Sequence, residues 1–293
     1  MTSSDVPRPA DDRKPRDDEI DVYGLTHVGK VRKANQDHFL IASVHKHVQI
    51  HLTSLTGPQR VPFGDERVAF FSMVADGVGG GEGGGQASAT TLEVASRYVV
   101  ESMNCYYSAD ASEATFIDAL QAAALRSHVA VVERAKATPG LRSMATTLTL
   151  WMGVWPWVYL LQVGDSRHYV YRDGALTQVT RDQTMAQDLV DQGVFTRAIA
   201  ERSQFSQVLS SAIGGPEAVP VVTRLRNSWG DVHLGCSDGL TKHVTDEQIA
   251  ERLAAMTSAK QVCEQLLQDA LDGGGTDNIT IIVGRAVPKD PPA

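Results

Sequence analysis

Residues 145–163, ATTLTLWMGVWPWVYLLQV, decide between two very different kinds of protein. They lie within residues 143–164, a run of 22 without a charged side chain, which is long enough to span a membrane. Threonines interrupt the run, however, and Pro156 stands in its middle. The β-branched and aromatic residues on both sides of a short Trp-Pro turn favour a buried β-hairpin. We therefore expect paired strands here and no membrane span.

Similar strand-like runs occur along the chain on both sides of this hairpin. They are rich in β-branched and aromatic residues and are separated by Gly, Pro, Asn and Asp. They comprise residues 22–29, 38–44, 47–52, 67–74, 168–179 (a hairpin around Asp173-Gly174), 219–226, 231–237 and 278–287. These runs predict a core built mainly from antiparallel strands.

Helical patterns stand between the groups of strands. Apolar residues recur at helical spacing in residues 87–103 and 113–136, and a mixed helical region covers residues 181–213. Capping boxes predict two late helices that begin at Thr245 and Ser258. Because helices come in pairs between groups of strands, the pattern argues against a doubly wound parallel sheet.

The order of these elements predicts a layered α+β fold (α/β/β/α). Two antiparallel β-sheets should pack as a sandwich, with helices on both outer faces. We expect one domain over residues 20–287. Residues 1–19, rich in charge and proline, read as a disordered tail, and residues 288–293 as a short C-terminal tail.

Composition excludes several classes of function. The chain has 27 Lys and Arg against 35 Asp and Glu, for a net charge of −8. An acidic protein is a poor candidate for binding nucleic acid or an anionic membrane surface. Three widely spaced cysteines form neither a disulfide framework nor a zinc ribbon, so we expect a reducing, cytoplasmic location.

Five aspartates stand where an apolar strand meets a glycine or another turn residue. They are Asp37, Asp76, Asp165, Asp238 and Asp277. Each one alone is most simply a turn residue. Together they can deliver five carboxylates to one pocket, and such hard oxygen ligands suit Mg²⁺ or Mn²⁺.

Asp76 is followed by a glycine-dense segment with seven glycines between Gly77 and Gly85. A glycine lets a backbone carbonyl approach a metal closely, although a flexible loop before a helix is the competing interpretation. Arg32 offers a planar fork that matches two phosphate oxygens, and the competing interpretation is a solvated surface charge.

Six short motifs carry a resemblance to a known family. In order, they are GLTHVGKVRKANQD (24–37), VADGVGG (74–80), MATTL (144–148), VGDSR (163–167), CSDGL (236–240) and TDN (276–278). The series resembles that of the bacterial metal-dependent type 2C protein serine/threonine phosphatases, from about Tyr23 to Val283. That family has a β-sandwich flanked by helices, in agreement with the pattern above.

The resemblance implies a centre of two Mn²⁺ or Mg²⁺ ions. Asp76 would bridge them, and the Gly77 carbonyl would bind one of them. Asp238 and Asp277 would bind the other. Arg32 would hold the phosphate of a phosphoserine or phosphothreonine, and water activated by the two cations would attack phosphorus in line.

Further roles follow from the same resemblance. Asp37 would act through bound water, and Asp165 matches an aspartate at which many bacterial members bind a third metal. Residues 181–215 correspond to a mobile flap beside the site. Its serine ligand for that third metal stays open between Ser206, Ser210 and Ser211.

The chain also departs from the family pattern. Val78 stands where animal members carry a histidine, so we expect the leaving alkoxide to be protonated by a metal-bound water near Asp165. Gln36 replaces a glutamate, and Ala145 replaces a glycine. Gly81 and Gly85 stand where bacterial relatives have His and Glu.

The expected function is hydrolysis of phosphoserine and phosphothreonine in proteins, by a monomer whose partners include a Ser/Thr kinase or its substrates. Three alternatives remain. Residues 24–31 nearly match a P-loop, but Val31 replaces the hydroxyl that would bind Mg²⁺. The chain can instead be a catalytically inactive binding module, or a phosphatase for one phosphorylated regulator such as an anti-sigma antagonist.

Overall fold

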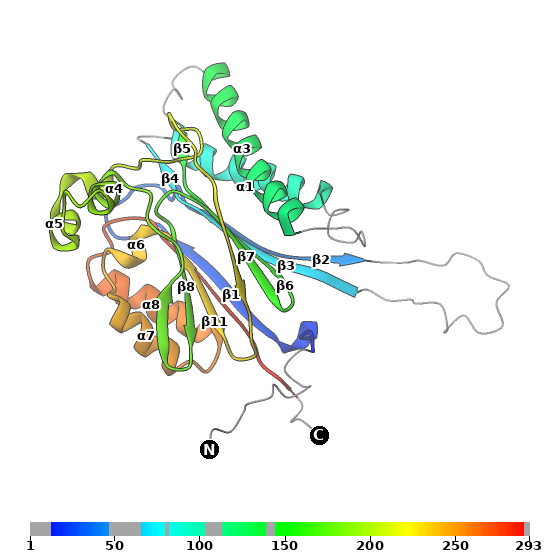
Figure 1. Cartoon of the computed structure of the whole chain (residues 1–293). Coiled ribbons are helices and arrows are strands. Elements are labelled where there is room, and N and C mark those ends of the chain that lie inside the picture. Colours follow the sequence, from blue (N-terminus) through cyan, green and yellow to red (C-terminus); the bar gives the residue numbers. More distant parts are fainter. Residues whose placement is uncertain (1–12, 47–65, 80–81, 103–112, 139–143, 290–293) are drawn as a thin grey trace, which may run out of the picture.

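The computed structural model describes residues 13–46, 66–79, 82–102, 113–138 and 144–289. In this part of the chain, two five-stranded antiparallel sheets pack face to face, and helices cover both outer faces (Figure 1). The predicted layered sandwich is confirmed. The strand predicted at residues 47–52 and most of the C-terminal tail lie outside the described residues.

Each sheet combines strands from distant parts of the chain. The first sheet has the order β1 (Ile20–His27), β12 (Ile279–Ala286), β11 (Val232–Cys236), β8 (Arg167–Arg172) and β9 (Ala175–Gln178). The second has the order β10 (Val221–Arg226), β7 (Trp157–Val163), β6 (Leu148–Val154), β3 (Glu66–Ala75) and β2 (His38–Lys46). Two short strands pair with each other: β4 (Gly77–Val78), which follows β3, and β5 (Ala145–Thr146), which precedes β6.

The helices form two separate outer layers. The second sheet is covered by α1 (Gly83–Glu101) and α3 (Glu113–Ala137). The first sheet is covered by α6 (Asp238–Thr241), α7 (Asp246–Ala254) and α8 (Ala259–Asp272). Between β9 and β10, the chain forms α4 (Met185–Asp191), α5 (Arg197–Arg202) and the 3₁₀ turn η4 (Gln204–Gln207), which project beside one end of the sandwich (Figure 1).

The hairpin predicted at residues 145–163 is confirmed over residues 148–163 as β6 and β7, whereas Ala145 and Thr146 form β5 and pair with β4. Its strands pair in register, with Trp151 opposite Leu160. Both side chains pack in the layer between the two sheets, against Val74 and Ile282. Within the described part of the chain, no helix combines the length and apolar character needed to cross a membrane.

The last three glycines of the glycine-dense segment, Gly83–Gly85, form the start of a helix. We predicted the helix from Ala87, but α1 begins at Gly83, four residues earlier. Glycine is a poor helix former, so local sequence argues against this start. A Cβ at Gly84 would lie 2.8 Å from backbone atoms of Gly77, and one at Gly77 would lie 2.5 Å from backbone atoms of Gly84. The glycines therefore permit a close backbone contact that a side chain would prevent.

Part of the predicted N-terminal tail is ordered. Within the tail assigned to residues 1–19, residues 13–19 pack on the domain, and Glu19 is only 2% exposed. Its carboxylate accepts hydrogen bonds from both terminal nitrogens of Arg13, at 2.7 and 2.8 Å. These contacts hold residues 13–19 against the domain, and the first twelve residues lie outside the described part.

The late helices begin at the residues that the sequence indicates. Thr245 forms a complete capping box with Gln248. Ser258 accepts a hydrogen bond from the backbone N–H of Gln261, but the Gln261 side chain accepts from Thr257 and does not complete the box.

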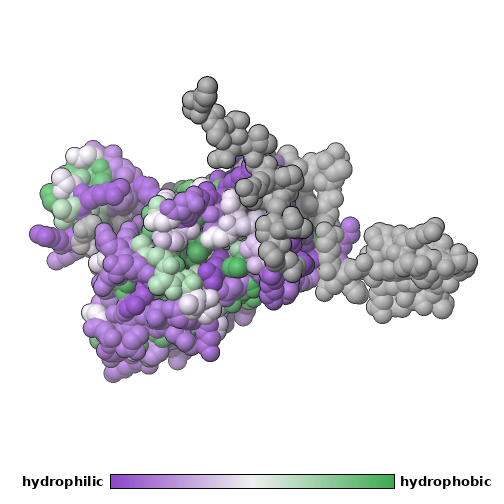
Figure 2. Space-filling view, turned by 90° about the horizontal axis from the view of Figure 1, so that it is seen from below, coloured by the Kyte–Doolittle hydropathy of each residue, from purple (hydrophilic) through white to green (hydrophobic). Residues whose placement is uncertain are grey.

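The end of the sandwich where β3 begins is loosely filled. Figure 2 shows apolar residues gathered on the face seen from below, among hydrophilic ones. A cavity of about 100 Å³ opens between the sheets at this end. Gly153 and Gly284 line it, two residues beyond the inward-facing Trp151 and Ile282. Because side chains alternate along a strand, both glycines stand at inward positions and leave this space.

Candidate metal centre

The five aspartates lie at the opposite end of the sandwich. Asp37 precedes β2, Asp76 follows β3, Asp165 follows β7, Asp238 begins α6 after β11, and Asp277 precedes β12. All of them except Asp37 line one polar cavity of about 140 Å³. Antiparallel pairing thus gathers residues from both sheets, because strand ends and strand starts alternate along one edge.

Asp76 is held through its backbone by the threonines of the MATTL motif. Its N–H donates to Thr147 Oγ1 (2.9 Å), and its carbonyl accepts from the Thr147 N–H (2.9 Å) and from Thr146 Oγ1 (2.7 Å). Burial raises the pKa of the Asp76 carboxyl well above its ordinary value, and the charges of Asp37 and Asp238 raise it further. Negative charge at this position is therefore unfavourable unless a cation offsets it.

Asp37 is buried, with 3% of its surface exposed, and does not line the cavity. Its Oδ2 accepts hydrogen bonds from Ser237 Oγ (2.7 Å) and Thr280 Oγ1 (2.8 Å). Its Oδ1 has no hydrogen-bond partner among the described residues. Burial raises the pKa of this carboxyl to about 6, although the two hydroxyl donors oppose the rise. Two hydrogen bonds to Oδ2 thus fix the Asp37 carboxylate, and Oδ1 is available to accept a further hydrogen bond.

Asp165 lines the cavity from the end of β7. Burial raises the pKa of its carboxyl to about 8, with a further contribution from the charge of Asp238. The next residue, Ser166, is buried and shares a hydrogen bond of 2.7 Å with the Thr147 hydroxyl. This bond joins the loop that carries Asp165 to the segment that holds Asp76.

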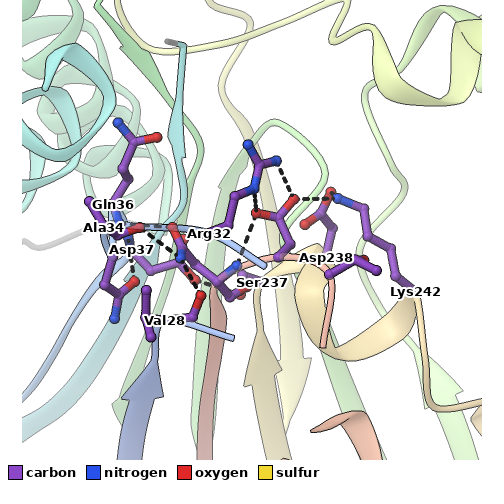
Figure 3. A network of polar contacts seen from close by, with 12 residues as sticks. Val28, Arg32, Ala34, Gln36, Asp37, Ser237, Asp238 and Lys242 are labelled. Atoms are coloured by element: carbon purple, nitrogen blue, oxygen red, sulfur yellow. Dashed lines mark hydrogen bonds and ion pairs between the residues drawn. The ribbon is translucent and has the colours of Figure 1, made fainter. Parts of the chain in front are cut away.

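Two cationic side chains neutralise the remaining carboxylates (Figure 3). Lys242 Nζ lies 2.6 Å from Asp238 Oδ2 and 2.8 Å from Asp277 Oδ2. Arg32 Nε lies 2.7 Å from Asp277 Oδ1, and its NH2 donates to Asp277 Oδ2 at 2.9 Å. Burial acts to raise the pKa of Asp277, but the hydrogen bonds from Arg32 and Lys242 outweigh it, so the net shift is downward.

The donor set suits a hard divalent cation. The cavity is lined by carboxylates and by Gly77, and Asp238 Oδ1 is buried without a hydrogen-bond partner among the described residues. In the same residues, no three His, Cys, Asp or Glu side chains are arranged to hold a metal ion, and Asp238 and Asp277 contact Lys242. Oxygen donors, burial and raised carboxyl pKa values together fit Mg²⁺ or Mn²⁺.

Asn278 fixes the loop that carries Arg32. Its Nδ2 donates to the carbonyls of Val28 (2.9 Å) and Ala34 (3.0 Å), and its Oδ1 accepts from the Gln36 N–H (2.9 Å). These bonds hold the loop between β1 and β2 against the start of β12 (Figure 3).

Several residues of the centre escaped the sequence analysis. Ser237, Thr280 and Lys242 touch the aspartates. Ser237 lies in the CSDGL motif, which gave it no role, and Thr280 and Lys242 lie outside the six motifs. Asn278 is part of the TDN motif, but the sequence indicated no role for its side chain. Lys242 lies four residues after Asp238, and that helical spacing is the one local signal for their contact.

The flap region contributes Gln207 and Leu209 to the cavity wall. Ser206, Ser210 and Ser211 do not line the cavity in the described structure. Ser211 Oγ accepts from the Val219 N–H, and Ser206 Oγ donates to the Ser203 carbonyl. The structure therefore brings Asp165 to the cavity without any of the three candidate serines.

Comparison with known proteins identifies relatives of the whole fold. The family model described as protein phosphatase 2C matches residues 63–272. The serine/threonine protein phosphatase PstP of Mycobacterium tuberculosis is 36% identical over 217 residues, which are 74% of this chain and 40% of PstP. A putative protein phosphatase of Mycoplasma pneumoniae is 26% identical over 265 residues, covering 88% of this chain and 92% of that protein.

Solved structures give the same result. The crystal structure of the M. tuberculosis phosphatase PstP matches 92% of this chain and 99% of its own with a TM-score of 0.72 and 28% identity. The PstP catalytic domain in complex with two manganese ions matches with a TM-score of 0.69 and 28% identity, over 92% of this chain and 99% of that chain. The family model and the fold agree, and this chain belongs to the protein phosphatase 2C family.

Proposed function

We propose that this chain hydrolyses phosphoserine and phosphothreonine in proteins, with two Mn²⁺ or Mg²⁺ ions. One observation carries the proposal: carboxylates from the ends of strands in both sheets line a single polar cavity with Arg32 at its wall. The family and the two manganese ions in the related PstP domain support it.

We assign Asp76, the Gly77 carbonyl, Asp238 and Asp277 as the ligands of the two ions. Asp165 is the candidate for a third. When bound, such cations lower the pKa of water and offset negative charge on phosphoryl oxygens. The hydrogen bonds of Thr146 and Thr147 hold the Asp76 backbone in place before substrate arrives. The contacts of Asn278 do the same for the loop that carries Arg32.

Arg32 is the proposed phosphate-binding residue. Its side chain is 55% exposed and reaches the cavity, with its guanidinium fork engaged by Asp277. A carboxylate and a phosphate present similar pairs of oxygens, so the fork can exchange one for the other. Asp37, held by Ser237 and Thr280, keeps one oxygen available to accept a hydrogen bond from water.

The partners proposed for this activity are phosphoproteins, including a Ser/Thr kinase or its substrates, and we further propose a monomer that acts in signal transduction in the bacterial cytoplasm. The P-loop alternative has no support, because Gly24 lies inside β1 opposite Ile282 and not in a phosphate-binding loop.

Metal dependence tests this function. Metal-stripped protein should release no phosphate from a phosphothreonine peptide, and Mn²⁺ or Mg²⁺ should restore release, whereas excess EDTA should abolish it again. ATP with Mg²⁺ serves as the control substrate for the P-loop alternative. Phosphate release that persists in EDTA, or a protein that stays inactive with both metals, would contradict the proposal.

A further inference from the structure

Lys242 is the cation of the centre that contacts two of the proposed metal ligands. It caps the C-terminus of α6, four residues after Asp238, and its side chain is 25% exposed. Its ammonium lies within hydrogen-bond distance of a carboxylate oxygen on each of Asp238 and Asp277, at 2.6 and 2.8 Å. Figure 3 shows this side chain pointing along α6 toward the carboxylates.

These two carboxylates are the proposed ligands of one divalent ion. An ammonium at 2.6 and 2.8 Å from Asp238 Oδ2 and Asp277 Oδ2 takes positions that metal coordination at about 2.0–2.2 Å would need. Two cations so close together also repel one another strongly in a partly buried site. The ammonium and the ion therefore exclude each other at these oxygens.

We propose that Lys242 is an internal competitor of the divalent cation, which neutralises Asp238 and Asp277 when the ion is absent and must withdraw before the ion binds. The inference rests on the function proposed above. It adds a property of this chain: Lys242 weakens metal binding and so sets the cation concentration at which the centre fills.

Among the described residues, Arg16 and Arg181 also contact two carboxylates each, but their side chains are 49% and 47% exposed and neither lines the cavity. Lys260 pairs with Glu264 at 3.7 Å on the surface of α8, with 62% of its side chain exposed. Arg32 contacts Asp277 alone of the two carboxylates and is 55% exposed, so water screens its charge. Lys242 is the more buried cation and contacts both carboxylates, while the other oxygen of Asp238 has no partner among the described residues.

Calorimetric titration of Mn²⁺ into metal-stripped protein, without substrate, tests the inference. Lys242→Met keeps the length of the side chain and removes the charge, and Lys242→Gln is a second neutral variant. Lys242→Arg keeps the charge, and Lys260→Met removes a lysine that is far from the carboxylates. Circular dichroism and thermal unfolding establish that each variant is folded.

We expect both neutral variants to bind Mn²⁺ at least about tenfold more tightly than the wild type, which corresponds to about 1.4 kcal/mol. Lys242→Arg and Lys260→Met should stay within about threefold of the wild type. Metal-free Lys242→Met should also unfold at a lower temperature than the metal-free wild type, because two carboxylates lose their shared cation.

Two results would overturn the inference. Unchanged or weaker Mn²⁺ binding in both neutral variants would show that Lys242 does not compete with the ion. An equal gain in Lys260→Met would show that only the net charge matters. If neither the wild type nor any variant binds Mn²⁺, the proposed function itself fails, and that outcome is distinct from the first two.

Discussion

Individual side chains at the centre combine burial with negative charge. Asp76 and Asp165 have raised carboxyl pKa values, and Asp37 keeps one oxygen without a partner among the described residues. A buried carboxylate is unfavourable unless a positive charge lies close to it. Lys242 and Arg32 supply positive charge to Asp238 and Asp277 only. The remaining negative charge is what a divalent cation would offset.

The pH dependence of the metal-free protein follows from these shifts. A carboxyl whose pKa is higher in the folded state stabilises the fold below its unfolded pKa, and this contribution is lost as pH rises through the folded pKa. Asp37 titrates at about 6 against an ordinary value of 3.8. We expect metal-free protein to lose about 2 kcal/mol of unfolding free energy between pH 4 and pH 7 through this group.

Urea unfolding at several pH values measures that loss. Asp37→Asn has no carboxyl to titrate and should show a flatter profile, whereas the surface variant Asp272→Asn should follow the wild type. A wild-type protein that becomes more stable from pH 4 to pH 7 without metal would contradict the assignment.

Asp165 should matter most when the leaving group needs a proton. Val78 supplies no acid at the edge of the cavity, so we expect Asp165 to support protonation of the departing serine or threonine oxygen. Asp165→Ala should slow hydrolysis of a phosphothreonine peptide about 10²-fold. Hydrolysis of p-nitrophenyl phosphate, whose leaving group needs no proton, should slow much less. Equal losses for the two substrates would rule out this role.

Among the elements, the strands carry most of the information that places the centre. The hairpin of β6 and β7 and the strand-end position of each aspartate are predictable because alternation and turn residues are local signals. The start of α1 is not, because the contact between Gly77 and Gly84 overrides helix propensity. Lys242 and Thr280 are not predictable either, because their partners are far away in the sequence. Thr280 contacts Asp37, and Lys242 contacts Asp277.

Two strand glycines give a matched test of packing between the sheets. A Cβ at Gly235 would lie 2.3 Å from the Trp151 ring, whereas one at Gly153 would meet only the Phe70 carbonyl, at 3.6 Å. Gly235→Ala should therefore lower the unfolding free energy by about 1–3 kcal/mol. Gly153→Ala should raise it by about 0.5–1 kcal/mol, because alanine loses less backbone entropy on folding. Chemical denaturation measures both, and the same sign for the two variants would refute this packing.

In the molecule as a whole, the centre joins the two sheets. Asp37 and Asp76 adjoin strands of the second sheet, whereas Asp238 and Asp277 adjoin strands of the first. A cation held by these residues would tie the two halves of the sandwich together and favour the folded state. At a Mn²⁺ concentration 100 times the dissociation constant, we expect about 2.7 kcal/mol of added stability.

A thermal shift assay checks this coupling. Mn²⁺ should raise the unfolding temperature of the wild type and of Asp272→Asn, and it should have little effect on Asp238→Asn. An equal rise in all three proteins would place the stabilising ion elsewhere in the molecule.

The most direct measurement is kcat/KM for a phosphothreonine peptide in saturating Mn²⁺, compared between Asp76→Asn and the surface control Asp272→Asn. Because Asp76 is the proposed bridging ligand, we expect Asp76→Asn to lose at least about 10³-fold with an unchanged circular dichroism spectrum, and Asp272→Asn to match the wild type. A folded Asp76→Asn protein that keeps a tenth or more of wild-type turnover would contradict the two-cation centre.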